Sequence, residues 1–174
     1  RDVCNDLPVR GTAQLCALPI MRGGSIRDCV VSYGQETDGQ RVGQGRGGGL
    51  AVSGDGSQAQ LDNVVVQRCQ AYSGGGVFVA LNGNASLVDL RIEDCVAEYD
   101  AGGVHFSKGL RGYLRADRVH VARCEGWTFA GGVQLEDGES TWTDSTVKDC
   151  ISQIGGGVNI KNGNHEFIRV SILR

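Results

Sequence analysis

Short stretches of alternating apolar and polar residues recur five times along this chain, each directly after a run of small residues rich in glycine. Two of the openings are Gly-Gly-Gly-Val at 74–77 and Ala-Gly-Gly-Val at 101–104. In every copy the first and third residues after the glycines are apolar and the second varies: Leu50/Ala51/Val52, Val77/Phe78/Val79, Val104/His105/Phe106, Val133/Gln134/Leu135 and Val158/Asn159/Ile160. A period of two with many β-branched residues predicts a β-strand with one buried face.

Two further sets of positions keep their chemistry from copy to copy. An aliphatic residue stands three positions before a cysteine in Ile26/Cys29, Val66/Cys69, Ile92/Cys95, Val121/Cys124 and Val147/Cys150. A turn dipeptide lies between each strand and the next cysteine: Asp55-Gly56, Asn82-Gly83, Lys108-Gly109, Asp137-Gly138 and Asn162-Gly163. Glycine adopts positive φ at little cost, and Asp or Asn supports the bend. Each copy is therefore expected to contain at least two strands.

The spacing of the copies decides between two interpretations of these turns. Such dipeptides often close β-hairpins, which would give five separate hairpins. Hairpins do not explain why every position keeps its chemistry over openings that lie 25 to 29 residues apart. Stacked coils explain it, because each residue then lies under its equivalent one coil up, with parallel strands ~4.8 Å apart. The sequence predicts an all-β parallel β-helix of about five rungs, with a crowded corner at Gly48, Gly75, Gly102, Gly131 and Gly156.

The pattern Gly-Gly-[Gly/Ala]-aliphatic, paired with aliphatic-x-x-Cys, resembles the polymorphic outer-membrane-protein repeats of autotransporter passengers. Those repeats carry Gly-Gly-Ala-[Ile/Leu/Val] and Phe-x-x-Asn, so an aliphatic residue here replaces Phe and a cysteine replaces Asn. More widely, the chain from about Met21 to its end is similar to right-handed parallel β-helices of the pectin-lyase type. The resemblance implies a right-handed coil.

The domain organisation follows from the same spacing. At 174 residues we expect one domain, with the β-helix at 21–174 and a lead-in or cap at 1–20. The long interval between Cys29 and Gly47 predicts an inserted glycine-rich loop at about 31–46. It is expected to be a surface insertion, with a contact loop that orders on a partner as the alternative. The last rung is expected to be incomplete.

Five of the seven cysteines occupy the repeated position and are expected to point inward. We expect these to form a ladder of small, buried and reduced side chains, since cysteine is among the most buried residue types. Disulfides within the ladder would be strained, because parallel Cβ vectors one rung apart leave the Cβ atoms too far from each other. Cys4 and Cys16 lie outside the ladder, and whether they bridge each other is left open. Cysteine usage therefore does not fix the redox compartment.

Charge adds one regular feature and excludes some functions. The residue before each ladder cysteine alternates in sign, through Asp28, Arg68, Asp94, Arg123 and Asp149. Opposite charges on adjacent strands contribute ~0.2–1 kcal/mol per pair, which favours a role in register and solubility. A net charge of −3 without a basic stripe argues against a nucleic-acid partner. No apolar run is long enough for a membrane-spanning helix.

Candidate catalytic residues would lie at the outward strand positions. Polysaccharide lyases and hydrolases on β-helices need clustered carboxylates there. No acidic pair occurs among Ala51/Ser53, Phe78/Ala80, His105/Ser107, Gln134/Glu136 and Asn159/Lys161. We therefore expect no catalytic residues, cofactor or metal, and we expect His105 and His120 to face solvent. Asn84-Ala85-Ser86 makes Asn84 a candidate glycosylation site.

Two apolar groups are candidate partner contacts. Tyr72, Tyr99, Trp127 and Phe129 gather at the corner after the cysteines, where they either pack under the corner or bind a partner. The last strands contain Phe167, Ile168, Val170 and Ile172, which would leave an apolar edge open to another strand.

The function expected from these features is a non-catalytic structural or adhesive interaction module within a larger chain or assembly. Its partner would be a protein, or further β-helix coils, at the C-terminal edge, and a glycan is a possible further ligand. An extracellular or cell-surface location is expected. The alternative is a carbohydrate-binding or carbohydrate-cleaving β-helix.

Overall fold

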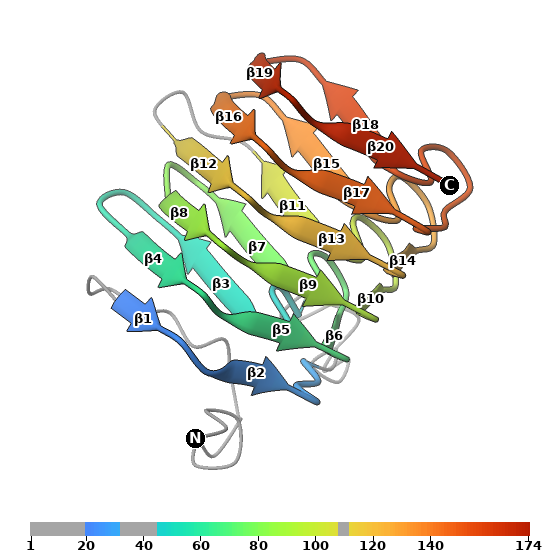
Figure 1. Ribbon diagram of the computed structural model, residues 1–174, viewed down its shortest axis with the longest axis horizontal. Helices are drawn as coiled ribbons and strands as arrows, with labels where there is room; N and C mark the ends of the chain where they lie inside the picture. The colour runs from blue at the N-terminus through green and yellow to red at the C-terminus, as the bar shows by residue number, and fades with distance from the viewer. Residues whose placement is uncertain (1–19, 32–44, 108–111) are drawn as a thin grey trace, which may run out of the picture.

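The computed structural model describes residues 20–31, 45–107 and 112–174 (Figure 1). These residues form twenty β-strands and no helix, and every strand pair is parallel. The chain is an all-β parallel β-helix of about five turns, which confirms the predicted fold class. The alternative of five hairpins is wrong, because hairpin strands would pair in antiparallel fashion.

Four sheets run along the stack, and two of them contain six strands each. Sheet 1 has the order β1 (Ile20–Arg22), β4 (Gln58–Asp62), β8 (Asn84–Val88), β12 (Tyr113–Asp117), β16 (Glu139–Thr143) and β19 (Asn164–Ile168). Sheet 2 has the order β2 (Ser25–Arg27), β5 (Val65–Gln67), β9 (Arg91–Glu93), β13 (His120–Ala122), β17 (Thr146–Lys148) and β20 (Ser171–Leu173). Each coil therefore contributes one strand to each of these sheets.

The other two sheets are smaller. Sheet 3 has the order β18 (Val158–Lys161), β15 (Val133–Glu136), β11 (Val104–Ser107), β7 (Val77–Ala80) and β3 (Leu50–Ser53). Sheet 4 has the order β14 (Glu125–Gly126), β10 (Val96–Ala97) and β6 (Gln70–Ala71). We number the coils from the N-terminus: coil 1 has β1 and β2, coil 2 has β3 to β6, coil 3 has β7 to β10, coil 4 has β11 to β14, coil 5 has β15 to β17 and coil 6 has β18 to β20.

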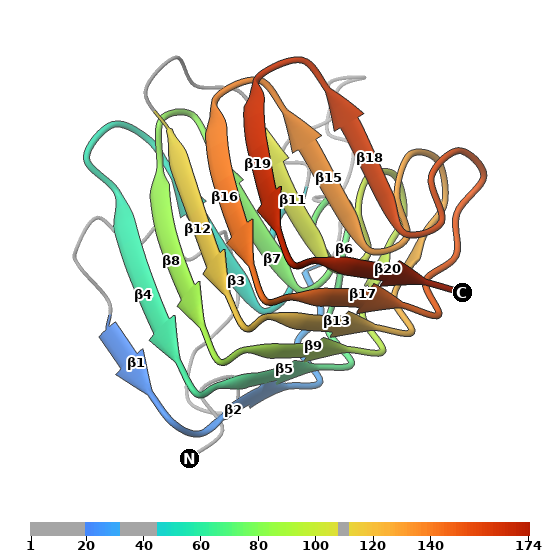
Figure 2. The ribbon, with the colours of Figure 1, turned by 45° about the horizontal axis from the view of Figure 1, so that its top comes forward.

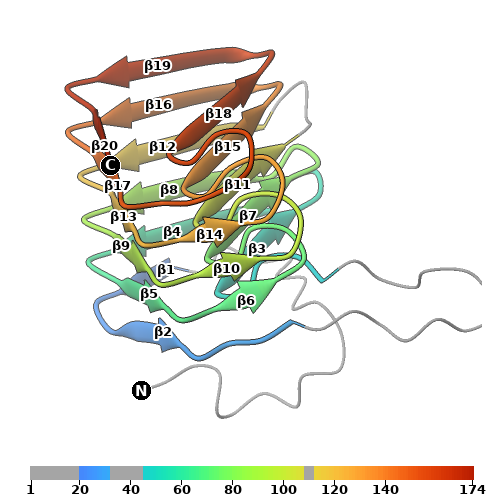
Figure 3. The same cartoon turned by 90° about the vertical axis from the view of Figure 1, so that its right-hand side faces the viewer.

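The sheets surround the interior of the stack (Figure 3). The predicted apolar positions meet there in one core. Val79 is paired in register with Val52 on one side and with Phe106 on the other. Trp142 and Phe106 are the largest fully buried side chains. Equivalent residues thus lie over one another, and the alternating pattern becomes a continuous core. Residues 1–19, with Cys4 and Cys16, most of the predicted insertion at 31–46, and the Lys108-Gly109 turn lie outside the described ranges.

The corner before sheet 3 is crowded in the way the repeated glycines predict. A Cβ on Gly75 would lie 2.4 Å from the carbonyl oxygen of Val96 and 2.6 Å from that of Gly102 in the next coil. A Cβ on the following Gly76 would lie 2.6 Å from a methyl group of Ile92. Both glycines are therefore needed for space, the first against backbone and the second against the core.

Coils 1 to 5 also bend twice, and coil 6 once, through residues in the left-handed region, which residues other than Asn, Asp and Gly rarely adopt. The first bend joins sheets 1 and 2, and the second precedes the ladder cysteine. We call these the first and second corner positions, and they lie five residues apart. First corner positions are Gly23, Asn63, Asp89, Arg118, Asp144 and Arg169, and second corner positions are Asp28, Arg68, Asp94, Arg123 and Asp149.

Substitution of a corner glycine by alanine should destabilise the fold in the middle of the stack but much less in the last coil. Gly75→Ala places a Cβ against two backbone oxygens and should lower the free energy of unfolding by about 3 kcal/mol or more. Gly156 holds the same position in coil 6, where the nearest atom to a new Cβ is the carbonyl oxygen of Cys150 at 3.0 Å. Gly156→Ala should therefore cost less than about 1 kcal/mol. Urea unfolding measures both, and equal losses would contradict this account of the corner.

Candidate interaction surface

The last coil, β18 to β20, lies at one end of the described stack (Figure 2). It exposes side chains at positions that are buried in the coils beneath it. Ile160 is 51% exposed, whereas Leu135, its partner in register, is fully buried. Ile172 is 54% exposed, whereas its partner Val147 is 1% exposed. The last coil therefore ends the described stack with an uncovered section of the core.

The four residues predicted to contact a partner at this end do not all point the same way. Phe167 points into the core, where its ring stacks on that of Trp142 with centroids 6.5 Å apart. Val170 also packs against the core, and both side chains are only partly buried. Ile168 pairs with Thr143, a position on the outer face of sheet 1. Phe167, Val170 and Ile172 thus belong to the exposed core section, while Ile168 lies beside it.

The backbone of the last coil also forms sheet hydrogen bonds on one side only, among the described residues. Within the described ranges, β18, β19 and β20 each lie at the end of their sheets and pair with a strand on one side only. In coil 5 the N–H of Asp144 donates to the carbonyl oxygen of Ile168 at 2.9 Å. The N–H of Arg169, the same position in coil 6, has no backbone acceptor among the described residues. Such an edge is a template for a further strand.

A second apolar surface runs along the corner between sheet 4 and the next glycine pair. Tyr72 and Tyr99 stack with their rings 5.2 Å apart and nearly parallel, and Phe129 meets Tyr99 edge-on at 5.5 Å. Trp127 is 64% exposed, and Tyr99 is 41% exposed. Ile151 and Ile154 extend the exposed apolar residues toward the last coil. We call Tyr72, Tyr99, Trp127, Phe129, Ile151 and Ile154 the corner ridge.

The charged corner positions form ion pairs between coils. Arg123 donates two hydrogen bonds to Asp94, at 2.7 and 3.1 Å, and Arg118 does the same to Asp89, at 2.6 and 3.0 Å. Arg68 with Asp28 and Arg169 with Asp144 repeat this geometry. Sequence reasoning found only the second corner series. The first was missed because Gly23 and Asn63 interrupt its alternation in coils 1 and 2.

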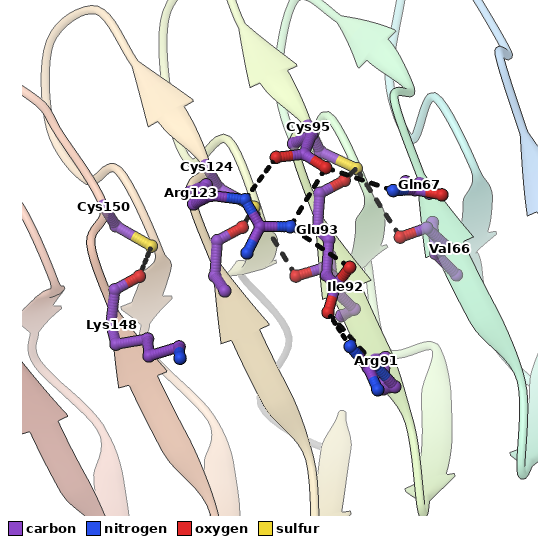
Figure 4. A network of polar contacts seen from close by, with 12 residues as sticks. Val66, Gln67, Arg91, Ile92, Glu93, Cys95, Arg123, Cys124, Lys148 and Cys150 are labelled. Carbon is purple, nitrogen blue, oxygen red and sulfur yellow. Dashed lines mark hydrogen bonds and ion pairs between the residues drawn. The ribbon is translucent and has the colours of Figure 1, made fainter.

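One carboxylate in this region is nearly enclosed (Figure 4). The Glu93 side chain is 8% exposed, and it accepts hydrogen bonds from Arg91 at 2.6 Å and from Arg123 at 3.2 Å. Burial alone would raise the pKa of Glu93, but the two guanidinium groups outweigh it and the pKa is lowered. The hydrogen bonds from Arg123 lower the pKa of Asp94 as well.

The cysteines differ from the expectation at two positions, Cys29 and Cys150. Cys69, Cys95 and Cys124 are free and buried, and Cys150 is free and partly buried. Cys29 is disulfide-bonded, so the expectation that it is a reduced thiol is wrong. Each free thiol donates to the carbonyl of the residue two positions before it, as Cys95 does to Glu93 at 3.3 Å. The neighbouring Cys95 thiol and burial both raise the pKa of Cys69.

The expectation that His105 faces solvent is also wrong. His105 is 4% exposed, and its Nδ1 lies 3.2 Å from Oδ2 of Asp100. Ser73 donates a hydrogen bond of 2.6 Å to the same oxygen. Asp100 precedes the glycine pair, so the end of this loop folds over the outer face of sheet 3 and covers the histidine. Asp100 thus lies within ion-pair distance of His105 and accepts a hydrogen bond from Ser73. His120 is half-buried on sheet 2.

A shallow groove of about 260 Å³ lies on the outer face of sheet 1, toward its glycine turns. Its lining includes Gln58, Gln60, Ser86, Tyr113 and Arg115, together with Ile20 and the candidate glycosylation residue Asn84. Asn84 Oδ1 accepts a hydrogen bond of 3.0 Å from the backbone N–H of Tyr113. The candidate glycosylation residue is therefore part of the groove wall.

Comparison of the chain with protein-family models, curated proteins and solved structures gives no match. Among the described residues, no group of three or more His, Cys, Asp or Glu side chains is placed to hold a metal ion. No helix in the described ranges has the length and hydropathy needed to cross a membrane.

Acid should weaken the ion pairs between coils. The pKa values of Asp28, Asp89, Asp94, Asp144 and Glu93 are all lowered in the folded chain. The folded state therefore binds protons less readily than the unfolded state, so this stabilisation is present above about pH 4 and is lost as the pH falls further. Thermal unfolding between pH 7 and pH 2.5 should show the loss, and Asp94→Asn should make it smaller. A melting temperature that does not fall in acid would contradict the prediction.

The buried thiols should resist modification. Cys69, Cys95 and Cys124 should not react with a thiol reagent in the native protein and should react after unfolding, because the folded core covers them. Cys95→Ser should lower the free energy of unfolding by about 1–3 kcal/mol, since it buries a more polar group in an apolar site. Cys150, which is only partly buried, serves as the faster-reacting reference. Rapid labelling of Cys95 in the native state would argue against this packing.

Proposed function

We propose that this chain is a non-catalytic structural or adhesive interaction module whose last coil is a template for a further parallel coil. That coil belongs either to a longer chain or to a partner protein. The observation that carries the proposal is the uncovered core of coil 6, where Ile160 and Ile172 are each about half exposed. Covering half of an isoleucine side chain is worth roughly 1 kcal/mol. Strand addition would also satisfy the open N–H and C=O groups of β18, β19 and β20.

The corner ridge is a second, independent observation that supports an interaction module. Large aromatic and aliphatic side chains that remain in solvent, such as Trp127 and Ile151, mark surfaces that bind other molecules. The half-buried Tyr72 and Phe129 hold the exposed Tyr99 from both sides, so its ring is already ordered. A rigid aromatic side chain loses little conformational entropy when it binds. We assign the ridge as a lateral contact surface.

The finer identity of the coil is part of this proposal. The Gly-Gly-[Gly/Ala]-aliphatic and aliphatic-x-x-Cys pattern supports a right-handed coil of the pectin-lyase type, with repeats like those of autotransporter passengers. The free thiols at equivalent positions support a ladder that replaces the asparagines of those repeats. A location outside the cell or on its surface fits the resemblance and the candidate site at Asn84.

The groove on sheet 1 favours carbohydrate binding as the second candidate function. Amide side chains of Gln58, Gln60 and Asn84 beside the ring of Tyr113 offer the hydrogen bonds and the apolar face that a sugar uses. A glycan array probed with the chain and with Tyr113→Ala tests this function. Binding that is lost in the variant would support it, and no binding to any glycan would exclude the groove as a site for the sugars present.

The main proposal predicts association that depends on concentration. Residues 1–174 should increase in mass with rising concentration in sedimentation equilibrium, because the open edge finds another strand. Ile160→Lys with Ile172→Lys should reduce this association, since charges would then occupy the apolar template. Leu81→Lys is the matched control, because Leu81 is 53% exposed in the turn between β7 and β8. A monomer at all concentrations, with amides 167–173 protected from exchange, would contradict the proposal.

A further inference from the structure

The charges at the corner positions change sign from one whole coil to the next. Coil 3 carries Asp at both corners, coil 4 carries Arg at both, and coil 5 returns to Asp. In coil 6 the first corner is Arg169. Arg174 follows Leu173, the partner in register of Lys148, and so holds the place of the second corner by its position in the sequence. Arg174 therefore stands opposite Asp149. From coil 3 to coil 6 the series reads acid, base, acid, base at both positions.

The ion pairs that join these residues all point the same way along the stack. In each of the four bidentate pairs, an arginine reaches back to the aspartate of the preceding coil. An arginine within the stack also has an aspartate at the same corner of the following coil, as Arg118 has Asp144. The hydrogen bond from Arg169 is the main cause of the lowered pKa of Asp144, and the positive charge of Arg118 lowers it further. Within the stack, then, each arginine at a corner has acid on both sides.

Coil 6 has acid on one side only. Arg169 pairs with Asp144 beneath it, and its side chain remains 67% exposed. Its backbone N–H points away from coil 5, as the equivalent N–H groups of Asp89, Arg118 and Asp144 point away from the coil beneath each of them. A strand that accepts this N–H would place its own corner residue next to the guanidinium group.

We infer that the coil which pairs with coil 6 carries a carboxylate at both corner positions, five residues apart, opposite Arg169 and Arg174. This inference rests on the proposed function, since it names the chemistry of the partner at the same template. The chain's own coils 3 and 5 show the form that such a segment takes: Asp89-Leu90-Arg91-Ile92-Glu93-Asp94 and Asp144-Ser145-Thr146-Val147-Lys148-Asp149. The aliphatic residue between the two acids, Ile92 or Val147, continues the core column that ends at Ile172.

A second copy of this chain fits less well as the occupant. Its coil 1 carries Gly23 and Asp28 at the two corners. Asp28 would continue the alternation after Arg174, but Gly23 would leave Arg169 without an acid. Head-to-tail stacking of copies would therefore place an acid opposite Arg174 but not opposite Arg169.

The experiment adds a seventh coil taken from the protein itself. Residues 124–149, which begin at the ladder cysteine and include both acidic corners of coil 5, are repeated directly after Arg174. The matched control carries Asp144→Arg and Asp149→Arg in the added copy only. Hydrogen exchange at the Arg169 amide is compared in the two extended chains and in 1–174. The amide of Asp144 in the original coil 5, which already donates to Ile168, reports whether the parent stack is intact.

The acidic seventh coil should slow exchange of the Arg169 amide relative to the arginine control by about tenfold, as two favourable pairs replace two like-charge contacts. Replacing Arg169 and Arg174 by Gln should abolish that difference. Equal protection by both added coils would overturn the charge rule and leave the strand template in place. Protection by neither coil, with Asp144 still protected, would overturn both the rule and the proposed function.

Discussion

The close approach of successive coils at the glycine corner is the constraint on which the rest of the structure depends. The carbonyl oxygen of Gly102 lies where a Cβ of Gly75 would need to be, so the backbone of one coil rests directly on the next. A slip of one residue would bring side chains into that contact and would turn every inward column outward. The register is therefore fixed, and any residue type that repeats in sequence becomes a column in space.

Much of the register and of the core could be predicted from the sequence, because the close contact at the glycine corner is local and recurs in every repeat. The column through Val52, Val79 and Phe106 was predictable from alternation after each glycine pair, and the structure confirms it. Alternation identifies the outward face of a strand, but it does not tell whether a loop covers that face. His105 was therefore misplaced, since its cover comes from Asp100 in the preceding loop. The disulfide of Cys29 was missed for a similar reason, because its position in the repeat is the same as that of the free thiols.

The glycines and apolar columns fix register within a coil, but they do not distinguish one coil from another. Each coil offers nearly the same core, so a shift by one entire coil would keep the apolar contacts. The corner charges remove that ambiguity. Such a shift would place Asp94 opposite Asp149, or Arg118 opposite Arg169, and like charges on adjacent strands are unfavourable. Exposed ion pairs contribute little to stability on average, so their regular alternation is better explained by this discrimination.

In the assembly that we propose, the apolar edge of the last coil supplies affinity for a further strand and its arginines supply selectivity. Ile160 and Ile172 offer apolar area to any strand of suitable length, and the backbone edge accepts any sequence. A template made of these alone would also bind wrong strands, which is the general hazard of open sheet edges. Arg169 and Arg174 add a repulsive element against basic partners as well as an attraction for acidic ones. Specific recognition commonly needs both. In the assembly that we propose, the residues that keep the stack in order would also select, on its last coil, the strand that is added.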